Sequence, residues 1–158
     1  MSEIMICRPT EQDILDACDI AIAAWTPIRE VFRREMGDEL YEAFFTDWQP
    51  SKRAAVSEEL HSPRGYVTKV DGKVVGFISY TIDGEHAVVG TNAVSPDCRG
   101  MGIGGKQYQF IFERMKEEGA LYASVHTGGD DGHAPPRRAY EKAGFEAFLP
   151  TRTYYKKL

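Results

Sequence analysis

Glycine is concentrated in one short segment, and this segment offers the clearest chemistry in the chain. Four of the 15 glycines lie within six residues, at Gly100, Gly102, Gly104 and Gly105, whereas only Gly37 precedes residue 65. A helical pattern of apolar residues follows the cluster. The first N–H groups of a helix have no partner within it and lie at its positive end, so they can bind a phosphate. Glycines let such an anion approach the backbone closely. The segment therefore predicts an anion-binding loop, with a ligand-free tight turn as the alternative.

Two nucleotide-binding motifs also match these glycines, but their surroundings fit poorly. Gly100, Gly105 and Lys106 satisfy G-x-x-x-x-G-K, yet Gln107 stands where a Ser or Thr would bind magnesium. The same segment satisfies G-x-G-x-x-G, which should follow a strand at once and be followed by an acidic residue about 20 positions later. Here Pro96 intervenes, and no carboxylate ends the next predicted strand. Both interpretations are disfavoured.

The first 64 residues favour helices after a short first strand. Residues 4–8 are predicted to be that strand, and Thr10 is predicted to be the N-cap of a first helix, which Pro27 should interrupt. Residues 28–60 should form two or three further helices, punctuated by Gly37 and Pro50. Their aromatic residues are predicted to face the core, with contact to a substrate as the alternative. These residues are Phe32, Tyr41, Phe44, Phe45 and Trp48.

The chain changes character at Gly65. Three runs rich in β-branched and aromatic residues, at 66–70, 73–82 and 85–94, are separated by Asp-Gly pairs, which predicts a three-stranded antiparallel meander. Downstream we expect a helix at about 104–118, a strand at 121–125, a helix that carries Tyr140, and a final strand pair. The predicted final strands are Phe145–Leu149 and Arg152–Lys157, separated by Pro150.

Two segments together resemble the signatures of the GCN5-related N-acetyltransferase (GNAT) superfamily. Residues 93–104 look like its strand ending in Val-x-Pro, followed by [Q/R]-x-x-G-x-[G/A] at the start of a long helix. Residues 139–145, Ala-Tyr-Glu-Lys-Ala-Gly-Phe, look like its helix ending in Tyr-Glu-Lys-x-Gly-Phe. The strand and helix at the start of the chain also resemble the family's usual beginning, so the resemblance covers nearly the whole chain.

The resemblance implies one N-acetyltransferase domain over residues 1–158, with an α/β (α+β) fold. The family fold is a mixed, mostly antiparallel sheet of six to seven strands flanked by helices. Its fourth and fifth strands run parallel and splay apart, leaving a V-shaped cleft for acetyl-CoA as co-substrate. The implied acceptor is a primary amine of a small molecule or a peptide.

The resemblance also assigns residues to the acetyl-CoA site. Backbone N–H groups of the glycine segment would bind the pyrophosphate; these belong to Arg99, Gly100, Met101, Gly102, Ile103, Gly104 and Gly105. The backbones of Ala93 and Val94 would bind the pantetheine arm. His133 stands where many members have an Asn that contacts this arm, so the contact would be altered. Arg137 either reaches the CoA phosphates or lies on the helix surface.

Tyr140 matches the family tyrosine that commonly protonates the departing thiolate, although a buried packing role is the alternative. The general base is less clear, because the fourth-strand positions that carry it in other members are Val88 and Gly90 here. His126, after the predicted fifth strand, is a candidate base because a histidine titrates near neutral pH. A water chain or an amine that arrives deprotonated would also serve. The missing base leaves a non-catalytic acyl-CoA-binding module as the rival function.

Composition narrows the remaining possibilities. The net charge of −5 argues against a nucleic-acid partner. Three widely spaced cysteines, Cys7, Cys18 and Cys98, share no CxxC pattern, which predicts reduced thiols and neither a disulfide framework nor a metal site. We recognise neither a signal peptide nor an apolar run long enough to span a membrane, so we expect a cytoplasmic protein. The resemblance makes a homodimer possible, because dimers are common in the family.

Overall fold

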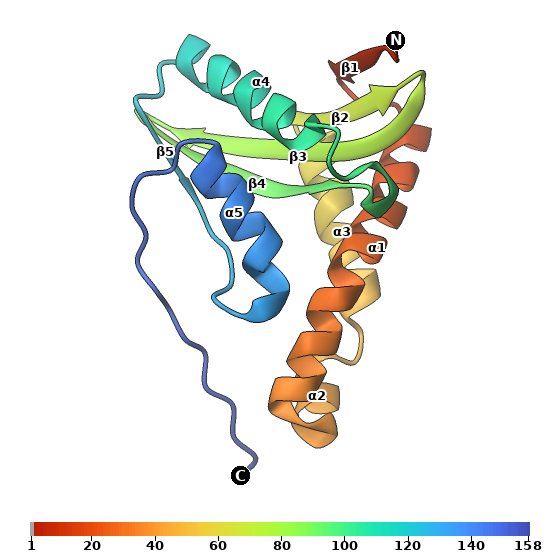
Figure 1. The fold of residues 1–158 in the computed structure, drawn as a ribbon, viewed down its shortest axis with the longest axis vertical. Helices are drawn as coiled ribbons and strands as arrows, with labels where there is room; N and C mark the ends of the chain where they lie inside the picture. The colour runs from red at the N-terminus through yellow and green to blue at the C-terminus, as the bar shows by residue number, and fades with distance from the viewer. Residues whose placement is uncertain (1) are drawn as a thin grey trace.

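A short strand and a long helix open the fold of the computed structural model, which describes residues 2–158 (Figure 1). β1 spans Ile4–Cys7 and α1 spans Glu11–Met36. Thr10 caps α1 reciprocally with Asp13. Its Oγ1 accepts a hydrogen bond from the Asp13 N–H at 3.2 Å, and the Asp13 carboxylate accepts one from the Thr10 N–H at 2.9 Å. Such a capping box satisfies two N–H groups that the helix leaves free. The predicted N-cap is confirmed.

The predicted interruption at Pro27 is wrong, because α1 continues through it to Met36. A proline inside a helix costs about 3 kcal/mol, since it removes one backbone hydrogen bond and its ring crowds the preceding turn. Burial on both sides of the proline offsets this cost: Ala21 is 0% exposed and Ile28 is 6% exposed. The Thr26 hydroxyl also donates to the carbonyl of Ile22 at 2.7 Å. Tertiary packing thus overrides the local preference.

Two further helices complete the first part of the chain. α2 spans Asp38–Phe45 and α3 spans Trp48–His61, with the break between α1 and α2 at Gly37, as predicted. Pro50 does not separate helices, contrary to expectation. It lies in the first turn of α3, where a missing N–H removes no hydrogen bond within the helix.

The sheet begins with the predicted antiparallel meander. β2 (Gly65–Val70), β3 (Lys73–Asp83) and β4 (His86–Val94) follow one another, and β1 pairs antiparallel with β2. β5 (Tyr122–Val125) pairs with β4 in parallel. Within residues 2–158 the sheet has five strands in the order β1-β2-β3-β4-β5, so the expectation of six to seven strands is wrong.

The residues predicted to form the final strand pair have no regular secondary structure. In Figure 1 the segment from residue 145 onward leaves α5 and runs as an extended coil toward α2. The ring of Tyr155 packs against Phe44 and Phe45, with centroid distances of 4.8 and 5.9 Å. Lys157 forms an ion pair with Glu39 of α2. The predicted final strand pair is therefore wrong, and Tyr155 and Lys157 of this segment contact a helix instead.

Helices cover both faces of the sheet, and a hydrophobic core lies on each face. α1 and α3 pack on one face; α4 (Ile103–Glu117) and α5 (Ala134–Lys142) pack on the other. Successive side chains of a strand point to opposite faces. Phe77 of β3 accordingly joins the α1–α3 core, and Ile78 joins the α4–α5 core; both are at most 1% exposed. Among the helices that the structure describes, none is long and apolar enough to cross a membrane.

Candidate active site

β4 and β5 separate halfway along β4 and open a cleft. The two strands pair from His86–Tyr122 to Val89–Val125, and no pairing continues beyond Val89 in the described chain. The resulting cleft has a volume of about 1960 Å³ and is lined by residues from α1, α3, β4, α4, α5 and the C-terminal coil. The splayed parallel pair predicted from the sequence is confirmed. The cleft therefore brings together segments that lie far apart in the chain.

The glycine segment forms the turn that leads into α4, at the edge of this cleft. Gly100 and Gly102 have φ angles of 80° and 74°, a left-handed conformation that costs other residues about 1–2 kcal/mol. A Cβ at Gly100, Gly102 or Gly105 would meet no atom within 4 Å, so the surface beside these backbones is open. The N-terminus of α4 has no side-chain cap. The predicted anion-binding loop therefore has both free N–H groups and room for a ligand.

Most residues predicted to bind acetyl-CoA lie along the cleft. Ala93 and Val94 line it from β4, and His133 lines it from the short 3₁₀ turn η2 (Asp131–His133). The glycine segment also lines it, except Met101, whose side chain is 47% exposed. Arg137 is not among the lining residues. Its Nη1 donates to the carbonyls of Gly128 and Asp130, at 2.8 and 2.6 Å. Arg137 thus holds the loop between β5 and α5 in its present shape.

Tyr140 lies where β4 and β5 part, in a chain of three polar side chains. The hydroxyl of Tyr108, on α4, donates to Asn92 Oδ1 at 2.9 Å. This contact orients the amide, so Asn92 Nδ2 donates to the Tyr140 hydroxyl oxygen at 3.1 Å and to the carbonyl of Gly90 at 3.0 Å. Tyr140 is 9% exposed and lines the cleft. Burial raises its pKa above the ordinary value, and the hydrogen bond from Asn92 opposes this rise. The phenol therefore keeps its proton at neutral pH.

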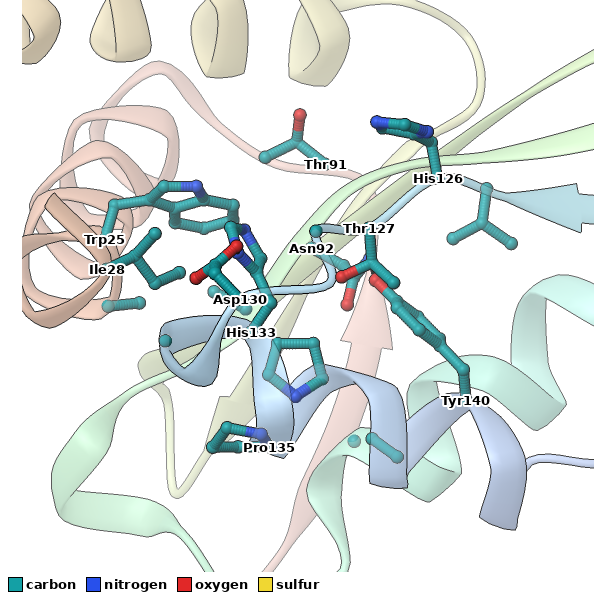
Figure 2. A pocket seen from close by; sticks show the side chains of 18 of the residues that line it. Trp25, Ile28, Thr91, Asn92, His126, Thr127, Asp130, His133, Pro135 and Tyr140 are labelled. Atoms are coloured by element: carbon teal, nitrogen blue, oxygen red, sulfur yellow. Dashed lines mark hydrogen bonds and ion pairs between the residues drawn. The ribbon is translucent and has the colours of Figure 1, made fainter. Parts of the chain in front are cut away.

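His126 lines the same cleft but lies apart from Tyr140. It directly follows β5, and its side chain is exposed. In Figure 2 its ring points away from the phenol of Tyr140, whose hydroxyl points toward Asn92 and Thr127. The sequence therefore located His126 at the cleft, but the geometry gives it no contact with the Tyr140 group.

A carboxylate that the sequence reasoning missed lies beside the middle of β4. The register of β3 and β4 shifts here, so that Gly90 and Thr91 together face the single residue Ser79. Glu59 of α3 accepts hydrogen bonds from the Thr91 N–H at 2.8 Å, the Thr91 hydroxyl at 2.7 Å and the Ser79 hydroxyl at 2.5 Å. The bulge frees the Thr91 N–H from the strand ladder, and three donors then fix the carboxylate. Glu59 lines the cleft.

Glu59 occupies space that a side chain at position 90 would need. A Cβ on Gly90 would lie 2.8 Å from Glu59 Oε2 and would also collide with Ser79 Oγ. Gly90, one of the two fourth-strand positions considered for a base in the sequence, therefore has no room for a side chain, and the carboxylate of Glu59 from α3 occupies that space. A glycine inside a strand pattern is a sequence signal for a bulge or a close approach. It cannot reveal which distant residue approaches.

The loop between β5 and α5 holds two polar atoms without partners. Thr127 Oγ1 and Asp130 Oδ2 are buried and make no hydrogen bond, although both residues line the cleft. Asp130 Oδ1 contacts His133 Nδ1 at 2.6 Å, and Figure 2 shows this pair on the Trp25 side of the cleft. Unpaired buried polar atoms are costly, so a hydroxyl and a carboxylate in this state indicate a site completed by a ligand.

A sequence model of the Acetyltransferase (GNAT) family matches residues 25–145, from the middle of α1 to just past α5. The chain belongs to this family. The GNAT match includes both the glycine segment and the helix that carries Tyr140, and it makes the protein an acyltransferase. A search of curated proteins finds no match.

Solved GNAT structures share the fold at low sequence identity. The PaiA N-acetyltransferase from Thermoplasma acidophilum, in complex with coenzyme A, is 16% identical over 91% of this chain and 90% of that one, with a TM-score of 0.69. The ribosomal-protein-S18-alanine N-acetyltransferase from Escherichia coli is 16% identical over 98% and 85%, with a TM-score of 0.66. An aminoglycoside N-acetyltransferase in complex with CoA is 14% identical over 100% and 97%, with a TM-score of 0.62. These likenesses concern the fold alone.

The cleft fits an elongated nucleotide thioester in two separate places. The open backbone of Gly100, Gly102 and Gly105 offers N–H groups to a diphosphate without crowding it. The buried, unpartnered hydroxyl of Thr127 offers a hydrogen bond to a polar group that lies in the gap between β4 and β5. Both features are compatible with the diphosphate and the polar arm of such a ligand.

Proposed function

We propose that this protein is an acetyl-CoA-dependent N-acetyltransferase that acts on a primary amine of a small molecule or a peptide. One observation carries the proposal: the protonated phenol of Tyr140 is aligned by Asn92 at the point where β4 and β5 part, in the same cleft as the glycine turn. Bound acetyl-CoA would supply an activated acetyl thioester. The glycine segment would bind its pyrophosphate, and Ala93, Val94 and Thr127 would bind its pantetheine arm.

Tyr140 is proposed as the general acid that protonates the thiolate. The hydrogen bond from Asn92 Nδ2 occupies the phenol oxygen as an acceptor, so the phenol hydrogen is free to point into the cleft. Its raised pKa, caused by burial, keeps this hydrogen in place at neutral pH. A positioned proton donor of this kind contributes about 10²–10⁴-fold to a rate.

Glu59 is proposed to bind the acceptor ammonium and to receive its proton, directly or through water. Its carboxylate is held rigidly beside the β4 bulge, and it makes no ion pair with any residue that the structure describes. The amine must lose a proton before it attacks, and a fixed carboxylate meets this need. Glu59 is favoured over His126 because its carboxylate adjoins the Gly90–Asn92 segment that also holds Tyr140 in position.

The test is thiol release from acetyl-CoA with a panel of amino acids, peptides, polyamines and aminoglycosides, with the acetylated product identified by mass spectrometry. We expect acceptor-dependent thiol release and an N-acetyl product. Tyr140→Phe should lower kcat by about 10²-fold or more while the affinity for acetyl-CoA stays near that of the wild type. A Tyr140→Phe enzyme with wild-type kcat would refute the assignment of the acid. Tight acetyl-CoA binding without turnover of any amine would favour the acyl-CoA-binding module.

A further inference from the structure

Two cationic side chains that have no carboxylate partner line one pocket beside the acceptor end of the cleft. Arg29 of α1 and Lys52 of α3 line a second pocket of about 430 Å³, and Lys52 also lines the main cleft. Neither side chain forms an ion pair with an acid anywhere in residues 2–158. The two spaces therefore lie on either side of the Lys52 side chain.

Arg29 is enclosed by aromatic rings that leave its hydrogen-bond donors unused. Its guanidinium carbon lies 4.9 Å from the ring centroid of Phe45 and 5.3 Å from those of Phe32 and Trp48. Its Nε is buried without a partner, and no side-chain hydrogen bond from Arg29 occurs in the described residues. Aromatic rings accept no conventional hydrogen bond from these N–H groups, so the guanidinium keeps donors that can bind a planar anion.

Lys52, like Arg29, contacts an aromatic ring and has no ion-pair partner among the described residues. Its Nζ lies 4.2 Å from the ring centroid of Trp25. Burial lowers the pKa of Lys52, and the charge of Arg29 lowers it further, whereas the charge of Glu59 opposes both effects. Holding two like charges together in a partly buried site is unfavourable unless an anion joins them. The pocket thus lacks the negative charge that would balance it.

We propose that this pocket binds a carboxylate of the acceptor, so that the amine substrate also carries an acidic group, as an amino acid or a short peptide does. This inference rests on the proposed acetyltransferase function and names its substrate class. Glu59 and Lys52 are seven residues apart on α3, which places them on one face about 10.5 Å apart along the helix axis. An acceptor with its ammonium at Glu59 can therefore extend its carboxylate toward Lys52 and Arg29. Several bonds must separate its two charged groups.

The test compares acceptors that differ only in this charge. The pairs are 6-aminohexanoate with 6-aminohexanamide, and glycylglycine with its amide. We expect kcat/KM to favour each acid by at least about tenfold, mainly through KM, because two charge-assisted contacts are lost in the amide. In Arg29→Met and Lys52→Met, the ratio of kcat/KM for the acid to kcat/KM for the amide should fall toward one. Arg29→Lys keeps the positive charge and should therefore retain part of the preference. Arg34→Met, an exposed position on the same helix, should keep the full preference.

A binding measurement separates this inference from the proposed function. The chain has two tryptophans, Trp25 and Trp48, and both contact the paired cations, so intrinsic fluorescence reports on the pocket. Saturable quenching or enhancement by 6-acetamidohexanoate, absent with its amide and lost in Arg29→Met, would support the carboxylate pocket even in an inactive enzyme. Equal responses to acid and amide, or none, would overturn it. Turnover of amines without preference for the acid would overturn it while leaving the acetyltransferase proposal intact.

Discussion

The two walls of the cleft use different parts of the polypeptide. On the wall proposed for acetyl-CoA, the groups that face the ligand are mainly backbone N–H groups of a glycine turn and of β4. On the wall proposed for the acceptor, they are side chains that converge from α1 and α3, with the C-terminal coil beside them. The backbone groups of the first wall come from short continuous stretches of sequence. The side chains of the second wall come from residues that are distant in sequence and are brought together by folding. The difference predicts that substitutions on the two walls affect different kinetic parameters.

The largest effect on the acceptor wall should come from Glu59→Gln, which removes the charge at nearly constant shape. We expect kcat/KM for the acceptor to fall by about 10²-fold because the ammonium loses both its partner and its proton acceptor. The KM for acetyl-CoA should change little. Steady-state kinetics with both substrates varied measures this, and Glu58→Gln, an exposed neighbour on α3, is the matched control. If Glu59→Gln raised only the KM for acetyl-CoA, the assignment of Glu59 to the acceptor wall would be wrong.

Gly102→Ala, on the acetyl-CoA wall, should have a smaller effect, and this effect should concern acetyl-CoA instead of the acceptor. The new Cβ meets no protein atom, but it intrudes where the diphosphate would approach, so the KM for acetyl-CoA should rise about tenfold. Gly119→Ala is the control, since Gly119 also has a positive φ and open space but lies outside the cleft. Both variants should lose about 1–2 kcal/mol of stability from backbone strain. Equal effects of both variants on the KM would show that strain alone is responsible.

The C-terminal coil belongs to the acceptor wall through Tyr155, and its contribution should be modest. Tyr155→Ala removes the aromatic contacts with Phe44 and Phe45 and should lower the free energy of unfolding by about 1 kcal/mol. Kinetics should show a raised KM for the acceptor and an unchanged KM for acetyl-CoA. Phe148→Ala, at a position that is 84% exposed and outside the residues that line the cleft, serves as the control. The same change in stability and in both KM values for the two variants would exclude docking of the coil through Tyr155.

The smallest expected effect is a loss of stability at high pH, caused by the two tyrosines that hydrogen-bond with Asn92 between the two walls. Burial raises the pKa values of Tyr108 and Tyr140 in the folded protein, so these phenols ionise in the unfolded chain first, near pH 10. Their contribution to stability is therefore complete below pH 10 and is lost as the pH rises toward the folded pKa values. Urea unfolding between pH 8 and 11 should show this decline, and Tyr108→Phe should make it shallower. An unchanged slope in that variant would argue against the assignment.

The sequence predicted the features that depend on local patterns. The Asp-Gly pairs between runs of β-branched and aromatic residues led to the β2–β4 meander, and the glycine segment led to the turn before α4. Pro27 and the final segment were predicted wrongly for a common reason, because burial of Ile28 and packing of Tyr155 on α2 outweigh local preference. Phe145–Leu149 and Arg152–Lys157 were predicted to be strands, yet Tyr155 contacts α2.

The acceptor wall could not be predicted because its members are distant in sequence. Gly90 marked a close approach, but its partner Glu59 lies 31 positions earlier and on another element. Arg29 likewise looked like one charge among many on a helix. The net charge of −5 likewise gives no sign of a pocket beside the cleft that is lined by the two cations Arg29 and Lys52.

The early end of pairing between β4 and β5 has a consequence for solubility. Residues 90–94 of β4 face no neighbouring strand on the β5 side, so an edge with unpaired peptide groups lies inside the sheet. Unprotected edges attract strands from other molecules, which is a common first step of aggregation. A bound co-substrate that lies along this edge would cover its unpaired peptide groups. Preparations stripped of CoA should therefore self-associate sooner than loaded ones.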